Sequence, residues 1–260
     1  MMVASMSDWN PAQYLRFADE RLRPALDLLA RVPLSRPRHV IDLGCGAGNV
    51  TAILKSRFAD ADVLGIDGSP AMLARARAAA PACQFEQADI GLWRPTTPPE
   101  LIYSNAALHW LDEHASLFPR LLSFLAPGGV LAVQMPAMQD APFRILQATI
   151  AAAGPWAAHL GDVAAARGIL PPEQYWDLLR PHAAELDIWT TTYLHALQGQ
   201  DPVLEWASGT SLRPLLDALP PDLRAAFRQA YADAVRPHYP PRPDGTTLLP
   251  FQRFFLVAQV

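Results

Sequence analysis

A run of glycines is the part of this chain best suited to hold a ligand. Residues 40–48 read Val-Ile-Asp-Leu-Gly-Cys-Gly-Ala-Gly, so an apolar stretch leads directly into three closely spaced glycines. Each glycine costs backbone entropy on folding, and this spacing predicts a turn in which the backbone approaches a ligand closely. We therefore expect Gly44, Cys45, Gly46 and Gly48 to bind a ligand at the end of a buried strand. A tight turn without a ligand is the alternative.

Asp42 indicates which ligand suits this loop. The order G-x-G-x-G differs from the G-x-G-x-x-G of dinucleotide-binding loops, because Asn49 stands where the third glycine belongs. A carboxylate two positions before the first glycine would repel a pyrophosphate and favour a cationic ligand. S-adenosyl-L-methionine fits, since its methionine tail carries an ammonium group beside a sulfonium. The sequence favours this methyl donor, with S-adenosyl-L-homocysteine as its product, and an NAD-dependent dehydrogenase is the rival.

Asp67 is the expected partner of the donor's ribose. It ends the second apolar run, 23 residues after Gly44, close to the ~20 residues that separate a glycine loop from a ribose-binding acid. Gly68 follows directly, and we expect it to border the same ligand. A plain turn at Asp67 and Gly68 is the alternative.

Four further positions, one in a helix and three at strand ends, complete the predicted donor site. Met72 falls in the first turn of a helix, where its thioether can pack on an adenine ring, although packing in the core explains it equally well. Asp89 and Ile90 are placed to meet the adenine amine, with a turn or a helix cap as the alternative. Asn105 is expected to face the methyl donor. The sequence around it lacks the N-P-P-[FYW] motif of methylases that act on nucleic-acid bases.

The elements that must position these residues form a regular alternation. From residue 38 to about residue 136, short apolar runs alternate with helical patterns, which is typical of βαβ units and a parallel sheet. The expected strands cover residues 40–43, 63–66, 83–87, 101–104, 130–134, 186–194 and 248–260. The expected helices between these strands cover residues 50–57, 70–79 and 114–125, and a further helix over residues 13–32 is expected ahead of the sheet.

The second half of the chain contains two long, mainly helical stretches. They exceed the ~4–6 residues of ordinary connections, so we expect a cap inserted over the sheet. The expected division is an N-terminal lid segment and helix in residues 1–37, a donor-binding sheet core in residues 38–136, 186–195 and 248–260, and a helical cap over the acceptor site in residues 137–185 and 196–247.

The composition restricts the class of function. The 260 residues are 51% hydrophobic and 18% charged, which suits a sizeable core. A net charge of −4 disfavours nonspecific binding to nucleic acid or an anionic membrane. Since we find neither an apolar run of ~20 residues nor a signal peptide, we expect a cytoplasmic protein. Cys45 and Cys83 lack zinc-ligand spacing, so no metal is expected. The 26 prolines are expected to begin helices and loops.

Four segments carry a family resemblance. Together, Ile41–Gly48, Gly65–Met72, Ala88–Ile90 and Ser104–Trp110 resemble the class I S-adenosylmethionine-dependent methyltransferases. The resemblance implies an α/β, Rossmann-like fold. We expect a seven-stranded, mostly parallel sheet with an antiparallel last strand, helices on both faces and an inserted helical cap.

A second resemblance extends over nearly the whole chain. The segments Ser7–Tyr14, Val130–Pro136, Asp187–Tyr193 and Leu212–Pro214 are similar to the trans-aconitate methyltransferases. That family esterifies one carboxylate of a small tricarboxylate to give a monomethyl ester. Its relatives also imply that aromatic residues near the N-terminus, here Trp9 and Tyr14, close over the donor.

The chain departs from that family at two positions. His109 stands where we expect a glutamine before Trp110, and Gln252 stands where we expect a proline before Arg253. Both departures fall near the presumed acceptor site, so they bear on which acid is methylated more than on the fold or the donor.

The implied acceptor requires positioning more than acid or base catalysis. A carboxylate is already ionised at neutral pH, so methyl transfer needs no general base, only alignment and exclusion of water. We expect His109 and Trp110 to line the acceptor site and Arg21, Arg213 and Arg253 to bind the anion. Arg213 is singled out because it lies in an apolar stretch, where an unpaired charge is costly. Arg21 and Arg253 rest on the resemblance, and another acid, a phenol or an amine is the alternative acceptor.

Overall fold

The computed structural model describes residues 18–161 and 168–260, with side chains from residue 22 onward in the first range. The strands are β1 (His39–Leu43), β2 (Asp62–Asp67), β3 (Gln84–Gln87), β4 (Leu101–Asn105), β5 (Val130–Pro136), β6 (Glu185–Leu197) and β7 (Thr247–Gln259). The helices are α2 (Ala18–Leu29), α3 (Asn49–Arg57), α4 (Pro70–Ala79), α5 (His114–Ser123), α6 (Pro142–Ala151), α7 (Ala157–Leu160), α8 (Pro172–Leu179), α9 (Pro202–Ser208), α10 (Arg213–Ala218) and α11 (Pro221–Val235). Two 3-10 turns, η1 (Leu108–Trp110) and η3 (Arg236–His238), complete the set.

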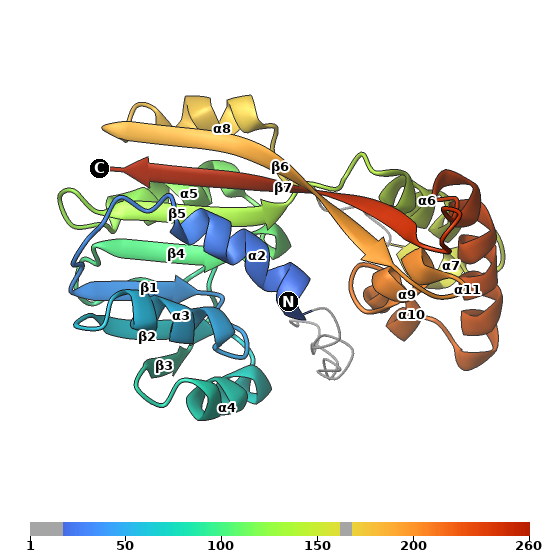
Figure 1. Cartoon of the computed structure of the whole chain (residues 1–260), viewed down its shortest axis with the longest axis horizontal. Helices are drawn as coiled ribbons and strands as arrows, with labels where there is room; N and C mark the ends of the chain where they lie inside the picture. The colour runs from blue at the N-terminus through green and yellow to red at the C-terminus, as the bar shows by residue number, and fades with distance from the viewer. Residues whose placement is uncertain (1–17, 162–167) are drawn as a thin grey trace. The chain divides into compact units, whose positions relative to one another are not determined.

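All seven strands join one sheet in the order β3-β2-β1-β4-β5-β7-β6 (Figure 1). β1 to β5 pair in parallel, whereas β7 runs antiparallel to β5. This confirms the predicted seven-stranded, mostly parallel sheet with an antiparallel last strand. The order reverses between β1 and β4, and a reversal of this kind opens a ligand crevice at the carboxyl ends of the two strands.

Helices cover both faces of the sheet, as predicted. On one face, Phe118 and Leu121 of α5 pack in the same core as Ile102 of the sheet. On the other face, the Tyr103 hydroxyl donates a hydrogen bond to the Ala25 carbonyl of α2. Because the central strands are covered on both sides, they read in the sequence as continuous apolar runs.

Proline begins many of the helices. Pro70, Pro142, Pro172, Pro202 and Pro221 are the first residues of α4, α6, α8, α9 and α11. A proline at this position loses no intrahelical hydrogen bond, and its fixed φ angle suits the first helical turn. The high proline content therefore marks helix starts, as expected, and does not indicate disorder.

The chain divides into two compact units. Among the described residues, the sheet unit comprises residues 21–137, 169–191 and 252–260, and the helical unit comprises residues 18–20, 138–161, 168 and 192–251. The boundary falls within β6 and β7, since each of these strands contributes residues to both units.

These bounds differ from the expected division at α8. Residues 169–185 were expected in the cap, but Tyr175 and Leu179 are buried in the core of the sheet unit. The Tyr175 ring lies 4.8 Å from Phe118 and 4.7 Å from Phe254, measured between centroids. The amphipathic pattern of α8 shows in the sequence, but the surface it packs against does not.

The helical unit has a hydrophobic core of its own. Trp206, Phe227 and Tyr231 are fully buried in it, and the Trp156 ring packs edge-on against Phe227 at 5.2 Å. This unit contains most of the predicted cap, and its role over an acceptor site stays a prediction. Within residues 18–161 and 168–260, every helix is too short or too polar to cross a membrane.

Candidate functional site

The glycine loop leaves β1 as a tight turn held by the neighbouring strand. The backbone N–H groups of Gly44 and Cys45 both donate to the Ile66 carbonyl, at 2.8 and 2.9 Å. Gly44, Gly46 and Gly48 have φ angles of 82°, 55° and 83°, in the left-handed region that side chains disfavour. The three glycines are therefore required by the backbone conformation.

The three glycines differ in what surrounds them. A Cβ on Gly44 would collide with the Cβ of Ala107, and a Cβ on Gly48 would lie 2.8 Å from the Ala76 Cα. A Cβ on Gly46 would meet nothing within 4 Å. Gly44 and Gly48 thus allow close packing within the protein, whereas Gly46 borders open space that a ligand can occupy.

Asp67 connects the loop to the next helix. Its two carboxylate oxygens accept hydrogen bonds from the backbone N–H groups of Gly46, at 2.9 Å, and Ser69, at 2.8 Å. The side chain of Ser69 caps α4 by accepting from the Met72 N–H. The predicted ribose acid is therefore held in place at the carboxyl end of β2, beside the open position at Gly46. Gly68, next to it, is exposed.

Asp42 is buried beneath the loop, with 1% of its surface exposed. Its Oδ2 accepts a hydrogen bond of 2.6 Å from the Thr51 hydroxyl of α3. Burial raises the pKa of Asp42 from 3.8 to about 7, the Thr51 hydrogen bond opposes this rise, and the nearby Asp67 carboxylate adds to it. Because burial disfavours the carboxylate form of Asp42, a cationic group close to it would stabilise that form.

The remaining predicted adenine contacts lie at the ends of β2 and β3. Met72 is half-buried in the first turn of α4. The Asp89 Oδ1 accepts from the Gly91 N–H at 2.8 Å, which is the turn foreseen as an alternative. Ile90 packs towards the loop, since a Cβ on Gly44 would lie 3.7 Å from its Cδ1. Adenine recognition by these residues stays a prediction.

Two buried amides meet at the ends of β4 and β5. Asn105 and Gln134 are paired in the sheet register, and the Ala106 N–H donates to the Gln134 carbonyl at 2.9 Å. Asn105 Oδ1 and both amide atoms of Gln134 are buried with no hydrogen-bond partner among the described residues. Ala106 has a φ of 53°, which is strained for a residue with a side chain. Buried unsatisfied groups beside a strained residue make this strand end a candidate site for a ligand.

His109 and Trp110 follow in η1. Their rings lie 4.7 Å apart between centroids, and His109 is half-buried whereas Trp110 is 50% exposed. Trp110 is thus not part of the core. An acceptor-lining role for both residues stays a prediction.

The structure places the side chains of two of the three predicted arginines, Arg253 and Arg213. Arg253 lies on β7, opposite Pro136, and is 6% exposed. Arg213, in the helical unit, pairs with Asp217 at 3.4 Å. The argument that singled out Arg213 is therefore wrong in its premise, because an aspartate one helical turn later accompanies the charge. The side chain of Arg21, and Trp9 and Tyr14 altogether, lie outside the described residues.

Another arginine was not foreseen from the sequence. Arg144 of α6 is half-buried and donates from Nη1 to the Gln147 Oε1 at 2.8 Å. Burial lowers its pKa, and among the carboxylates of residues 22–161 and 168–260 none forms an ion pair with it. The only sequence signal is its place in the first turn after Pro142-Phe143, which is too common to single it out.

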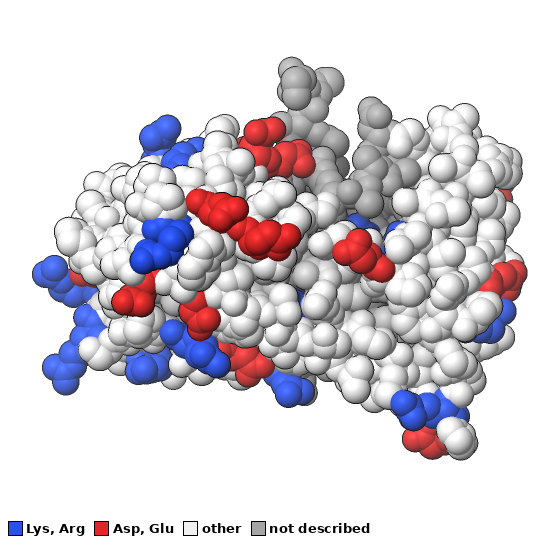
Figure 2. Space-filling model, turned by 90° about the horizontal axis from the view of Figure 1, so that it is seen from above, with Lys and Arg blue, Asp and Glu red and all other residues white. Residues whose placement is uncertain are grey.

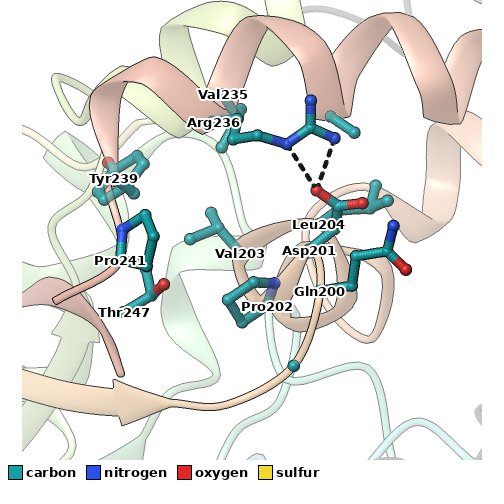
Figure 3. A pocket seen from close by; sticks show the side chains of 12 residues that line it. Gln200, Asp201, Pro202, Val203, Leu204, Val235, Arg236, Tyr239, Pro241 and Thr247 are labelled. Atoms are coloured by element: carbon teal, nitrogen blue, oxygen red, sulfur yellow. Dashed lines mark hydrogen bonds and ion pairs between the residues drawn. The ribbon is translucent and has the colours of Figure 1, made fainter. Parts of the chain in front are cut away.

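A small pocket in the helical unit does not suit an anion. It has a volume of about 140 Å³ and is lined partly by Pro202, Val203 and Tyr239 (Figure 3). Arg236 points to Asp201, which it meets at 2.9 Å, and it also pairs with Asp233 at 3.0 Å. Its charge is thus already neutralised by two carboxylates.

In the space-filling view, acidic and basic side chains lie side by side over the sheet unit, at the left of Figure 2.

Comparison with known proteins identifies the class. A methyltransferase-domain family matches residues 40–129, from β1 to the residue before β5. The structure also superposes on the YcgJ protein from Bacillus subtilis with a TM-score of 0.58 and 13% identity, covering 91% of this chain and 97% of that one. The domain match, the sheet order and the glycine loop together define a class I S-adenosylmethionine-dependent methyltransferase.

Two named relatives identify the family within this class of methyltransferases. The trans-aconitate 2-methyltransferase of Methylobacterium radiotolerans is 54% identical over 257 residues, covering 98% of this chain and 99% of its own. The enzyme of the same name from Methylobacterium nodulans is 51% identical over 255 residues, with the same coverage. The chain belongs to the trans-aconitate 2-methyltransferase family.

Proposed function

We propose that this protein transfers a methyl group from S-adenosyl-L-methionine to one carboxylate of trans-aconitate, giving a monomethyl ester and S-adenosyl-L-homocysteine. The observation that carries the proposal is the 54% identity to a trans-aconitate 2-methyltransferase across essentially the full length of both chains. A relationship this close includes the acceptor side of the chain as well as the donor loop.

The residues at the carboxyl edge of the sheet fit the donor. When bound, S-adenosyl-L-methionine supplies a methyl group made electrophilic by its sulfonium. Gly46 borders open space for the ligand, and Asp67 presents a carboxylate beside it for the ribose hydroxyls. The buried Asp42 favours the cationic methionine tail, and Asn105 offers an unsatisfied oxygen next to the transfer point. The other proposed donor contacts are Gly44, Cys45, Gly48, Gly68, Met72, Asp89, Ile90, Trp9 and Tyr14.

The acceptor side needs cations more than a base. The acceptor carboxylate is ionised at neutral pH, so no side chain has to remove a proton from it. Its other carboxylates must be held so that the attacking oxygen stays aligned, and guanidinium groups do this with paired hydrogen bonds. Arg253 is the predicted arginine whose side chain is buried. It directly follows Gln252, where the family is expected to have proline. Arg21 and Arg213 are proposed on the resemblance, and His109 and Trp110 are proposed to line the site.

The proposal is tested with a donor labelled in its methyl group. Purified protein is incubated with trans-aconitate, other di- and tricarboxylates, phenols and amines, and the products are then treated with mild base. A carboxyl methyl ester releases labelled methanol under base, whereas methyl ethers and methylamines do not. We expect base-labile label with trans-aconitate as the preferred acceptor. Turnover confined to phenols or amines would overturn the proposal.

A further inference from the structure

Gln134 of β5 is a buried polar side chain that the fold leaves unsatisfied. None of its surface is exposed, and neither amide atom, Oε1 or Nε2, has a hydrogen-bond partner among the described residues. Whichever way the amide is turned, it presents one donor group and one acceptor. Such groups are costly to bury unmatched, and native proteins rarely do so. A glutamine at this place is therefore explained better by a ligand than by folding.

Gln134 has neighbours on both sides on one face of the sheet. β5 lies between β4 and β7 (Figure 1), and side chains paired directly across strands share a face. Asn105 and Phe255 therefore flank Gln134. Arg253 is paired with Pro136, two positions further towards the carboxyl end of β5, and so lies on the same face. Every one of these residues belongs to the sheet unit, so the arrangement does not depend on the helical unit.

This row of side chains begins beside the glycine loop. A Cβ on Gly44 would collide with the Cβ of Ala107, two residues after Asn105. Between them, Ala106 has a φ of 53° and donates its N–H to the Gln134 carbonyl at 2.9 Å. Asn105 is only half-buried, so the row borders on the surface at this point. The amides of Asn105 and Gln134 therefore occupy the two strand ends next to the glycine loop.

Methyl transfer to a carboxylate sets a requirement on the group that holds it. A carboxylate oxygen forms a bond to the methyl carbon while the carbon–sulfur bond breaks, and the electron pair of that bond stays on sulfur. No proton moves, and one negative and one positive charge disappear together. An arginine on the reacting carboxylate would stabilise the anion before the transfer more than the ester after it, and would therefore slow the reaction. A neutral amide holds the carboxylate with less of this penalty.

We propose that the Gln134 amide donates a hydrogen bond to the carboxylate that receives the methyl group, and thereby aligns its attacking oxygen with the methyl carbon. This inference rests on the proposed function. Nε2–H holds one oxygen of the carboxylate and leaves the other free to attack. The Gln134 Oε1 is then left for the Asn105 amide, its neighbour on the same face, which can turn to donate to it. Arg253, further out on this face, is left for a carboxylate that is not methylated.

The direct test is the NMR signal of the Gln134 side-chain amide. Protein labelled with 15N-glutamine is compared with Gln134→Met, which identifies the signal by its absence. S-adenosyl-L-homocysteine is added to saturation, followed by trans-aconitate. We expect the acid to shift the Gln134 signal in the preformed complex with S-adenosyl-L-homocysteine. A Gln134 signal that does not respond to the acid would overturn the inference.

Gln259 provides the control for this measurement. It is paired with Val130 at the opposite end of β5, and its Nε2 donates to the Gly128 carbonyl at 3.0 Å. Its signal is identified in the same way from Gln259→Met. Because its amide already has a partner and lies at the other end of the strand, the acid should leave the Gln259 signal unchanged.

Kinetics show which carboxylate Gln134 holds. Gln134→Met should lower the single-turnover rate of methyl transfer to trans-aconitate about 10-fold to 100-fold, as for the loss of an aligning hydrogen bond to a charged group. Its KM for the acid should change by less than about 3-fold, because the other carboxylates keep their contacts. Its Tm should equal or exceed that of the wild type, and calorimetry should give wild-type affinity for S-adenosyl-L-homocysteine. Met135→Leu is the matched control, since Met135 is equally buried on the opposite face of β5, and its transfer rate should stay unchanged.

The outcomes distinguish the two proposals. If the wild type methylates trans-aconitate and Gln134→Met keeps the wild-type transfer rate, only the inference fails. A raised KM with an unchanged transfer rate would place a carboxylate that is not methylated at Gln134, and weaker binding of S-adenosyl-L-homocysteine would assign Gln134 to the donor; either result overturns the inference. If the wild type methylates none of the acids offered, the proposed function fails and the inference falls with it.

Discussion

Asp42→Asn should make the ligand-free protein more stable, and increasingly so as the pH rises. Burial raises the pKa of Asp42 from 3.8 to about 7, so the folded protein holds this proton more tightly than the unfolded chain does. The free energy of unfolding therefore falls as the pH rises from 3.8 to about 7. Asparagine avoids this penalty, because it cannot ionise and its amide oxygen can still accept from the Thr51 hydroxyl.

The size of the effect follows from the shift in pKa. Each pKa unit corresponds to about 1.4 kcal/mol of unfolding free energy. The ionisation of Asp42 should therefore lower the free energy of unfolding of the wild type by about 3 kcal/mol between pH 5 and pH 8. The assay is urea unfolding of both proteins at pH 5, 6, 7 and 8. We expect the stability difference between Asp42→Asn and the wild type to grow by that amount across the series.

Donor binding should reverse the shift at Asp42. A ligand with an ammonium group near Asp42 stabilises its carboxylate, so binding should release a proton, about 0.5 per ligand at pH 7 and about 0.1 at pH 8. Calorimetry of S-adenosyl-L-homocysteine in buffers of different ionisation enthalpy measures this number. The release should vanish in Asp42→Asn and with methylthioadenosine, which lacks the amino-acid tail. A stability difference that is constant with pH, together with no proton release, would refute the role assigned to Asp42.

Four more predictions concern the donor site and the N-terminal segment. Gly46→Ala should fold with a modestly lower Tm, because a Cβ there meets nothing within 4 Å although the φ of 55° is strained for alanine, and it should bind S-adenosyl-L-homocysteine poorly. Gly44→Ala should lower the Tm sharply by colliding with Ala107. Asp67→Ala should weaken donor binding in calorimetry by about 1.5–3 kcal/mol if both ribose hydroxyls bond to the carboxylate; an unchanged Kd would contradict that contact. Gln134→Met should keep or raise the Tm, since it removes an unsatisfied buried amide, while lowering turnover; a lower Tm with full turnover would indicate a hidden structural partner. Deleting residues 1–5 should leave kinetics unchanged and deleting residues 9–14 should raise the donor's KM, so equal activity of the longer truncation would show that Trp9 and Tyr14 form no lid.

The sequence alone determined the sheet and the glycine loop, because both depend on local patterns. Apolar runs alternating with helical periods predict parallel strands and crossover helices, and the observed strands agree with the expected ones to within a few residues at each end. The spacing of Gly44, Gly46 and Gly48 reflects φ angles that only glycine adopts freely. The placement of Asp67 at the end of β2 follows from the same alternation.

Only the tertiary structure decided which partner each buried charged or amide group has. Arg213 and Arg144 look alike in the sequence, as single arginines in apolar stretches. Among the described residues, Arg213 pairs with Asp217, whereas Arg144 donates to the Gln147 amide oxygen. The unsatisfied amide of Gln134 likewise depends on its register opposite Asn105, and the place of α8 depends on the aromatic surface that receives Tyr175. Local patterns fix φ angles and buried faces, but the partner of a buried charge or amide comes from chain segments far away in sequence, which no local pattern specifies.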